Sequence, residues 1–195
     1  MKHVPFLLRP VGKDYLWGGE RLKTEYHKQI DLTPLAETWE CSTHPDGCSI
    51  VDSGAAAGKP LRTVLQEHPE YLGIYANSEG ELPILIKLID AKKDLSVQVH
   101  PDDAYAKQYE NGQNGKTEMW YVLEAEPDAS LVYGFQHTMT PERLRQSLAE
   151  GTLEADLQSV PVSKNDAFLI PAGTVHAIGA GILLAEIQQL SLIHI

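Results

Sequence analysis

Side chains of the types that bind divalent metals lie in three separate stretches of the chain. Gln98 and His100 are two residues apart in SVQVHPDD, Glu118 lies in GKTEMWY, and His176 follows the turn sequence IPAGTV. Two imidazoles, one carboxylate and one amide oxygen form a ligand set that suits a divalent ion. With a single anionic ligand the site would keep a net positive charge, which favours binding of sugar oxygens and stabilisation of a developing oxyanion.

The stretch 96–100 must present its ligands on one side of an element. Read as a β-strand, it places Ser96, Gln98 and His100 on one face and Val97 and Val99 on the other, where we expect the valines to pack into the core. The polar face then points either into a cavity or to solvent, and these residues alone leave both interpretations open. In the second interpretation, His100 is a surface histidine.

Three residues near this set could bind an anionic group. Ser96 shares the face of the expected ligands, and Lys116 lies two residues before Glu118. Lys87 is a lone charge in the apolar run LPILIKLID. A buried lysine is costly unless it meets a partner, whereas a lysine that extends to the surface avoids that cost. A hydroxyl and lysines together would fit a phosphate group.

The surrounding sequence predicts mostly strands. Apolar or alternating runs separated by turn residues cover 82–90, 119–135 and 162–189, and they indicate an antiparallel sandwich or barrel. Helical patterns cover 59–73, 101–110 and 140–151. In the last of these, Thr140 can cap the helix, Pro141 lies in its first turn and Gly151 can end it. In such a fold Glu118 would come from a neighbouring strand and His176 from across the barrel, which favours the cavity.

Composition restricts the class of protein. The chain has 195 residues, enough for one sizeable core and one domain, with 43% hydrophobic and 22% charged residues. Its net charge of -11 disfavours nucleic acid and anionic membranes as partners. No apolar run is long enough to cross a membrane, and the N-terminus lacks a signal-peptide core, so we expect a cytoplasmic protein. Cys41 and Cys48 are then expected as free thiols.

Several motifs in order resemble class I mannose-6-phosphate isomerase, a zinc-dependent family of the cupin superfamily. They are LPILIKLID, LSVQVHPDD, GKTEMWY, FLIPAGTVHAIGAG and LLAEIQQ, preceded by LRPVGKDYLWGGERL and ETWECSTHPDG. The resemblance runs from about residue 6 to Gln189. It implies a mainly β fold, a cupin-type jelly-roll barrel with helical insertions, and one Zn²⁺ per chain.

The resemblance also implies roles for individual residues. The positions that match its zinc ligands are Gln98, His100, Glu118 and His176. The positions that match substrate-binding motifs are Ser96, Lys87, Trp17 and Glu40, the first two at the substrate phosphate. Lys116 matches an active-site lysine and is a candidate for the catalytic base, whose identity the residues leave open. The implied reaction interconverts mannose 6-phosphate and fructose 6-phosphate through a cis-enediol or enediolate.

The resemblance breaks after Gln189. The polar continuation typical of the family, with its active-site arginine and nearby aspartate, is replaced by LSLIHI. We therefore expect a truncated chain whose residues 190–195 are foreign to the fold. Metal binding would survive because every expected ligand lies upstream, but turnover would be much lower without the arginine. Sequencing the parent gene across codon 190 tests this expectation.

Two other functions compete with a sugar-phosphate isomerase. A metal-dependent cupin oxygenase would use two histidines and a carboxylate around Fe(II), which this chain partly provides. The amide of Gln98 and the nearby Lys87, Ser96 and Lys116 favour a phosphorylated substrate instead. A non-catalytic cupin that binds a sugar phosphate is the third interpretation, and it would bind the sugar phosphate with zinc present without isomerising it.

Overall fold

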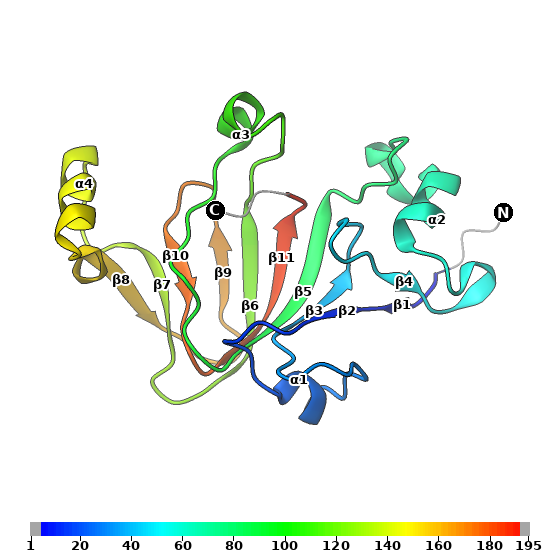
Figure 1. Ribbon diagram of the computed structural model, residues 1–195, viewed down its shortest axis with the longest axis horizontal. Coiled ribbons are helices and arrows are strands. Elements are labelled where there is room, and N and C mark those ends of the chain that lie inside the picture. Colours follow the sequence, from blue (N-terminus) through cyan, green and yellow to red (C-terminus); the bar gives the residue numbers. More distant parts are fainter. Residues whose placement is uncertain (1–4, 192–195) are drawn as a thin grey trace.

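Two antiparallel sheets dominate the computed structural model, which describes residues 5–191 (Figure 1). The six-stranded sheet has the order β2 (Val11–Lys13), β3 (Glu37–Cys41), β5 (Ile84–Ala91), β11 (Ile182–Gln189), β6 (Glu118–Ala125) and β9 (Ala167–Ile170). The three-stranded sheet has the order β10 (His176–Ile178), β7 (Ser130–Phe135) and β8 (Leu157–Pro161). A small sheet pairs β1 (Leu8–Arg9) with β4 (Ile50–Val51). The strand-rich fold expected from the sequence is confirmed.

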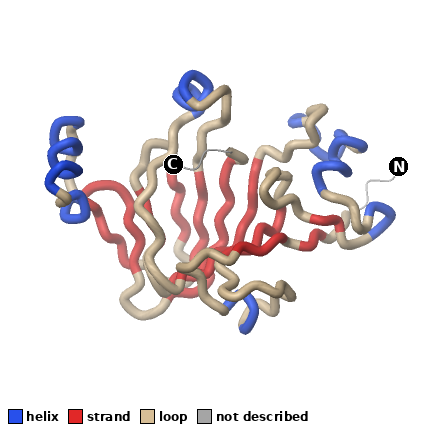
Figure 2. Tube along the Cα trace, viewed as in Figure 1, coloured by secondary structure: helices blue, strands red, loops and turns tan. Residues whose placement is uncertain are grey.

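Helices lie at the ends and edges of the sheets (Figures 1 and 2). The α-helices are α1 (Arg21–Thr24), α2 (Leu61–Glu67), α3 (Asp103–Tyr109) and α4 (Pro141–Glu150), with 3₁₀ segments at Gly54–Ala56, Pro69–Tyr75 and Leu153–Asp156. The three helices expected from the sequence are therefore present as α2, α3 and α4, with the first completed by a 3₁₀ segment. All of them are insertions between strands. The largest core cluster lies between the sheets, whereas α2 and the 3₁₀ segment Pro69–Tyr75 pack a separate, smaller cluster with Val51.

The inward face of the six-stranded sheet changes from apolar to polar along its strands. In β11, Ile182 and Leu184 are fully buried in the core between the sheets, and the next residues on that face are Glu186 and Gln188. Because β6 runs antiparallel, its order is reversed, from Glu118 at its start to Val122 in the core. The polar ends of neighbouring strands therefore lie side by side and leave one end of the sandwich for a polar cavity.

The stretch 95–100 does not form the regular strand that its alternation predicts. It runs extended beside β10 and pairs at a single bridge, where the amides and carbonyls of Gln98 and His176 exchange two hydrogen bonds of 2.9 Å. Val97 and Val99 are 43% and 41% exposed, so the expectation that they pack into the core was wrong. The main core is filled from the two sheets. The segment is also held by hydrogen bonds from the Leu95 amide to the Ile178 carbonyl and from the Gly173 amide to the His100 carbonyl, but its outer face stays exposed.

Helix α4 begins and ends where the sequence predicts. The Thr140 hydroxyl accepts a hydrogen bond from the Arg143 amide, Pro141 lies in the first turn, and Gly151 closes the helix with φ of 67°. A Thr140→Ala variant is expected to lose about 1 kcal/mol of unfolding free energy because that amide loses its acceptor. Urea denaturation followed by circular dichroism measures the loss. Thr138→Ala, exposed and outside the helix, is the matched control; equal effects of the two variants would refute the capping role.

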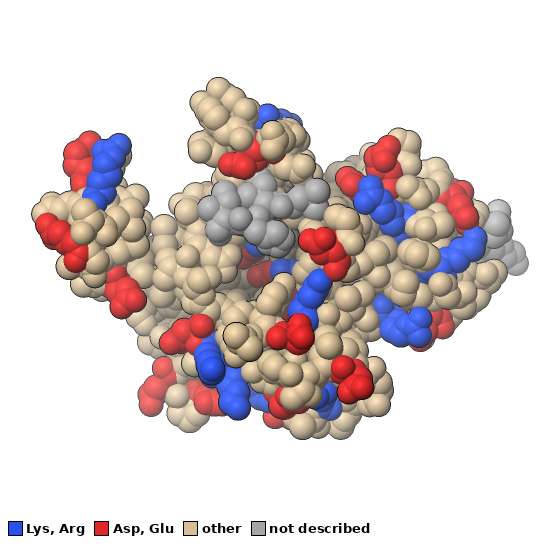
Figure 3. Space-filling view, viewed as in Figure 1, with Lys and Arg blue, Asp and Glu red and all other residues tan. Residues whose placement is uncertain are grey.

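The remaining expectations concern charge, cysteines and the chain end. Cys41 and Cys48 are free, as predicted. Figure 3 shows acidic and basic side chains intermixed on the visible face, without a continuous basic stripe. Among residues 5–191, no helix is both long enough and apolar enough to cross a membrane. Of the segment expected to be foreign, Leu190 packs with Trp39 and Leu85 in a small core cluster, and residues 192–195 lie outside the described residues.

Candidate metal centre and pocket

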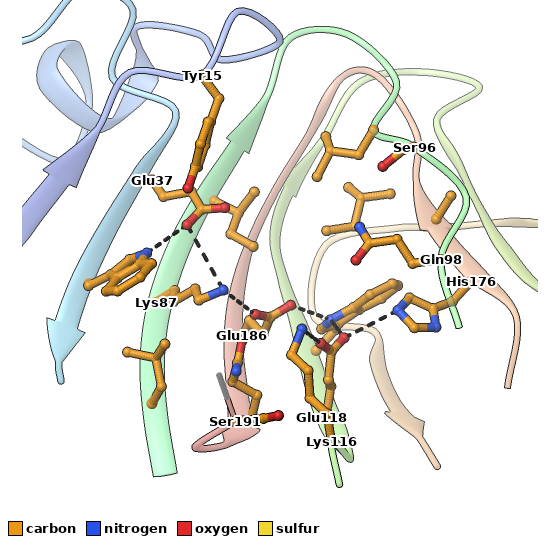
Figure 4. Close-up of a pocket in the computed structure, with 18 of the residues that line it drawn as sticks. Tyr15, Glu37, Lys87, Ser96, Gln98, Lys116, Glu118, His176, Glu186 and Ser191 are labelled. Carbon is orange, nitrogen blue, oxygen red and sulfur yellow. Dashed lines mark hydrogen bonds and ion pairs between the residues drawn. The ribbon is translucent and has the colours of Figure 1, made fainter. Parts of the chain in front are cut away.

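A cavity of about 300 Å³ lies over the polar end of the inward sheet face (Figure 4). One row of paired residues crosses four strands along its floor, from Trp39 through Lys87 and Glu186 to Trp120. The next row toward its end includes Gln188 and Glu118. Its volume is at the lower limit of small-ligand pockets, which span about 300–1,000 Å³.

His100, Glu118 and His176 meet at one side of this cavity, and all three are buried. One ligand-type atom from each lies within 4.8 Å of the other two. The Glu118 carboxylate contacts both rings, with Oε1 at 3.3 Å from Nε2 of His100 and Oε2 at 3.6 Å from Nε2 of His176. The sequence therefore identified three side chains that the fold brings together from a loop and two different sheets.

The turn 171–174 fixes the orientation of His176. Gly173 takes a φ of 83°, which favours glycine, and the Thr174 amide donates to the Pro171 carbonyl at 3.1 Å. The Thr174 carbonyl lies 2.8 Å from Nδ1 of His176. Because a carbonyl only accepts, Nδ1 carries the proton and the lone pair of Nε2 faces Glu118. Burial lowers the pKa of His176, which keeps the ring neutral and able to bind a metal.

Lys116 provides the positive charge nearest to Glu118. Its Nζ lies 2.5 Å from Oε1 of Glu118 and 3.1 Å from Nε2 of His100. Burial raises the pKa of the Glu118 carboxyl, but the hydrogen bond from His100 and the charge of Lys116 outweigh it, and the pKa lies well below its usual range. The carboxylate is therefore ionised and ready to serve as a ligand.

The residues fit a divalent metal. The cluster combines two imidazoles with one ionised carboxylate, a donor set typical of zinc and iron sites. Within the part of the chain that the structure describes, Nδ1 of His100 is buried without a hydrogen-bond partner, as happens where a binding site leaves donors or acceptors open. Gln98 lies directly opposite His176 at the bridge and lines the same cavity (Figure 4). Its amide oxygen stays the predicted fourth ligand.

Lys87 meets partners instead of extending to solvent. Its Nζ lies 3.0 Å from a carboxylate oxygen of Glu186 and 4.0 Å from one of Glu37. Burial lowers the pKa of Lys87, but the charges of Glu186 and Glu37 outweigh it and raise the pKa above its usual value. The lysine is therefore charged, and it lines the cavity together with both carboxylates. Its contact with a phosphate stays a prediction.

The other predicted substrate-binding residues divide into two groups. Trp17 and Ser96 line the cavity, as predicted for residues near a cleft.

Glu40 is not among the residues that line the cavity. Its carboxylate lies 2.6 Å from Lys28 and accepts from the Thr38 hydroxyl. The pairing of β3 with β5 shifts register after Trp39, and the carboxylate that β3 brings to the cavity is Glu37. A substrate contact of Glu40 stays a prediction that this placement does not favour.

Sequence reasoning missed Glu37, Glu186 and Trp120 as cavity residues. The alternation of polar and apolar residues in LLAEIQQ marks Glu186 as facing the same way as Leu184. That signal identifies a face without identifying what lies opposite. Only the pairing of β11 with β5 and β6 places Glu186 between Lys87 and Trp120.

Comparisons with known proteins identify the family of this chain. Residues 6–131 match the family model of the phosphomannose isomerase type I catalytic domain. The chain is 43% identical over 95% of its length to a probable mannose-6-phosphate isomerase, GmuF, of Bacillus subtilis, and 43% identical over 96% to a mannose-6-phosphate isomerase of Streptococcus mutans. It covers 58% of each of these proteins, so it spans less than two thirds of their length.

Solved structures agree on the fold. The crystal structure of the mannose 6-phosphate isomerase from Bacillus subtilis superposes with a TM-score of 0.90 at 36% identity, over 96% of this chain and 59% of that one. A structure from Archaeoglobus fulgidus, 24% identical with a TM-score of 0.76, shares the fold. The expected mainly β, cupin-type jelly roll with helical insertions is confirmed. Together with the matched family model, these likenesses show that the chain belongs to the type I phosphomannose isomerase family.

Proposed function

We propose that this chain carries the active site of a metal-dependent isomerase that interconverts mannose 6-phosphate and fructose 6-phosphate. The observation that supports this most is the buried cluster of His100, Glu118 and His176, which lies beside Lys116 in a polar cavity. In a member of this family, we assign to this cluster the interconversion of an aldose and a ketose.

The proposed metal is one Zn²⁺ per chain, held by His100, Glu118 and His176 with Gln98 as the fourth ligand. When bound, it would supply a Lewis acid that polarises the sugar oxygens on C1 and C2. The two imidazoles and the amide are neutral, and Glu118 is the only anion of this set. The set therefore leaves net positive charge for the oxygen that becomes negative in the reaction.

Proton transfer is the step that the protein's own residues must perform. Isomerisation of the aldose moves a proton from C2 to C1 through a cis-enediolate, and the hydroxyl proton of O2 moves to O1, so that the C1 carbonyl becomes a hydroxyl and the C2 hydroxyl a carbonyl. We assign the proton-handling role to Lys116, because its Nζ lies beside both Glu118 and His100 at the cavity wall. To accept the proton from C2, Lys116 must act as the neutral amine, and as the ammonium it can then give a proton to C1. Glu118 and His100 hold Nζ at this wall of the cavity.

The substrate phosphate is proposed to lie at Ser96 and Lys87, with Trp17 beside the sugar. Ser96, Lys87 and Trp17 all line the cavity, and Figure 4 shows Ser96 beyond Gln98 on the side away from Glu118. Because Glu37 and Glu186 already compensate the charge of Lys87, this lysine can bind a phosphate only by sharing its ammonium protons. We therefore expect Ser96 and the charge of the metal to contribute to phosphate binding as well.

The compartment proposed for this chemistry is the cytoplasm. Cys41 and Cys48 are free thiols in the structure, which agrees with a reducing compartment. A small phosphosugar is the proposed partner.

A coupled assay tests the proposed reaction. Purified protein loaded with Zn²⁺ is given mannose 6-phosphate, and fructose 6-phosphate is converted by phosphoglucose isomerase and measured through glucose-6-phosphate dehydrogenase. We expect isomerisation that falls to background with EDTA and returns with Zn²⁺, and calorimetric binding of mannose 6-phosphate but not of mannose. Isomerisation that is insensitive to the chelator would contradict the metal role, and zinc-loaded protein that binds no mannose 6-phosphate would contradict the substrate.

A further inference from the structure

Trp120 touches more of the metal cluster than its position in an apolar strand suggests. It lies on the inward face of β6, is 1% exposed, and is directly opposite Glu186 on β11. Its indole Nε1–H lies 2.9 Å from Oε2 of Glu186 and 3.2 Å from Oε2 of Glu118. One donor is therefore shared between two carboxylates on neighbouring strands.

This shared donor completes the set of contacts that hold Glu118. Lys116 binds Oε1 of that carboxylate, and Trp120 binds Oε2, the oxygen that faces His176. The Trp120 ring also packs edge-on against His176, with ring centroids 5.4 Å apart and planes at 74°. One side chain thus restrains two of the three residues in the cluster.

We propose that Trp120 is a positioning residue that orients Glu118 and His176 for the metal. The proposal rests on the metal site proposed above. A carboxylate that binds a metal needs a fixed orientation, and groups that hydrogen-bond to metal ligands commonly set both their geometry and the affinity of the site. The indole also lies between two acidic side chains, where its N–H offsets the repulsion that would turn Glu118 away.

The same indole joins the metal cluster to the other half of the cavity. Glu186 accepts from Trp120 through Oε2 and pairs with Lys87 through Oε1. Lys87 in turn lies near Glu37 (Figure 4). Lys87 is a proposed phosphate contact. Because Trp120 hydrogen-bonds to both Glu186 and Glu118, a shift of Lys87 that moves Glu186 is expected to change the orientation of Glu118 as well.

A pair of tryptophan variants tests the positioning role. Trp120→Phe keeps an aromatic ring and removes the N–H, and its Zn²⁺ affinity, measured by competition with a chromophoric chelator, is expected to fall about 10–100-fold. Trp39→Phe is the matched control, because the indole of Trp39 also donates to a cavity carboxylate, Glu37 at 2.7 Å, but touches none of the three clustered residues. Its Zn²⁺ affinity is expected to stay at the starting value.

The outcomes separate this inference from the metal site itself. If the unaltered protein fails to bind Zn²⁺, the proposed metal site is wrong. If it binds and Trp120→Phe binds as tightly, the positioning role is overturned while the metal site stands. An equal loss in both variants also overturns it, because the effect would then follow from any lost indole in the cavity.

Nuclear magnetic resonance of the unaltered protein provides a second measurement that needs no stable Trp120 variant. The chain has three tryptophans, so ¹⁵N labelling yields three indole N–H signals, assigned with Trp39→Phe and Trp17→Phe. On addition of Zn²⁺ we expect the Trp120 signal to shift and its hydrogen exchange to slow, with the Trp39 signal shifting far less. A Trp120 signal that does not respond to bound Zn²⁺ would overturn the proposal.

Discussion

Replacement of Glu118 by glutamine is expected to lower Zn²⁺ affinity by more than the roughly 10–100-fold that loss of a supporting hydrogen bond costs. The substitution keeps the shape of the side chain and removes the one anionic member of the His100, Glu118 and His176 cluster. It also removes the negative charge that lies 2.5 Å from Nζ of Lys116, so the ammonium repels the metal more strongly. Chelator competition and isothermal titration calorimetry measure the loss.

Glu40→Gln is the control for this prediction. Glu40 is also a glutamate on a strand of the same sheet, but its carboxylate pairs with Lys28 outside the cavity. Its loss is expected to leave Zn²⁺ affinity unchanged. Circular dichroism of both variants checks that they fold. Zinc binding by Glu118→Gln at the starting affinity would refute the metal role of Glu118. A comparable loss in Glu40→Gln would show that the affinity follows the net charge of the protein and not a direct contact of Glu118 with the metal.

The cluster of His100, Glu118 and His176 could be predicted from sequence because its signals are local. The turn residues Pro171 and Gly173 place His176 at the beginning of a strand, and Glu118 begins a strand directly after Lys116. Each signal depends on neighbours within a few residues. The order of the motifs then identified the family, whose fold brings the segments together.

What the sequence could not supply was the pairing between distant strands. Glu37 and Glu40 are equally plausible cavity residues until the register of β3 against β5, and its shift after Trp39, is known. Trp120 likewise reads as a core residue of an aromatic strand, and its contacts with Glu186 and His176 depend on the pairing of β6 with β11 and on the packing of the two sheets. Pairing of this kind is decided by packing over the whole sheet and not by any short pattern.

The prediction that Val97 and Val99 in SVQVHPDD pack into the core was wrong for a related reason. Period-two patterns report which side chains share a face, but they do not show whether a second strand covers the other face. His100 is buried at the cluster, which is one of the two alternatives that its pattern left open, whereas Val97 and Val99 are exposed on the other face. The placement of Gln98 at the cavity agrees with the structure, and the role of Gln98 and His100 as metal ligands stays a prediction.

Replacement of Lys87 by methionine is expected to destabilise the fold by about 3–5 kcal/mol, the usual consequence of removing one partner from a buried ion pair. The side chains of Glu186 and Glu37 are only 5% and 9% exposed, and Lys87 is the cation that both approach. Methionine retains most of the volume of the lysine stem, so the loss reports charge and not a cavity. Urea unfolding of the metal-free protein measures it.

Two further variants decide whether the missing charge is the cause. Lys164→Met removes the lysine of an exposed pair with Glu124, with side chains 58% and 39% exposed, and should cost no more than about 1 kcal/mol. Adding Glu186→Gln to Lys87→Met removes the nearer unpaired carboxylate and should restore part of the lost stability, because the cost lies in the buried negative charge. If the double variant is no more stable than Lys87→Met, the destabilisation comes from lost packing of the lysine stem. In that case, Lys87 does not hold the two carboxylates of the cavity floor in place.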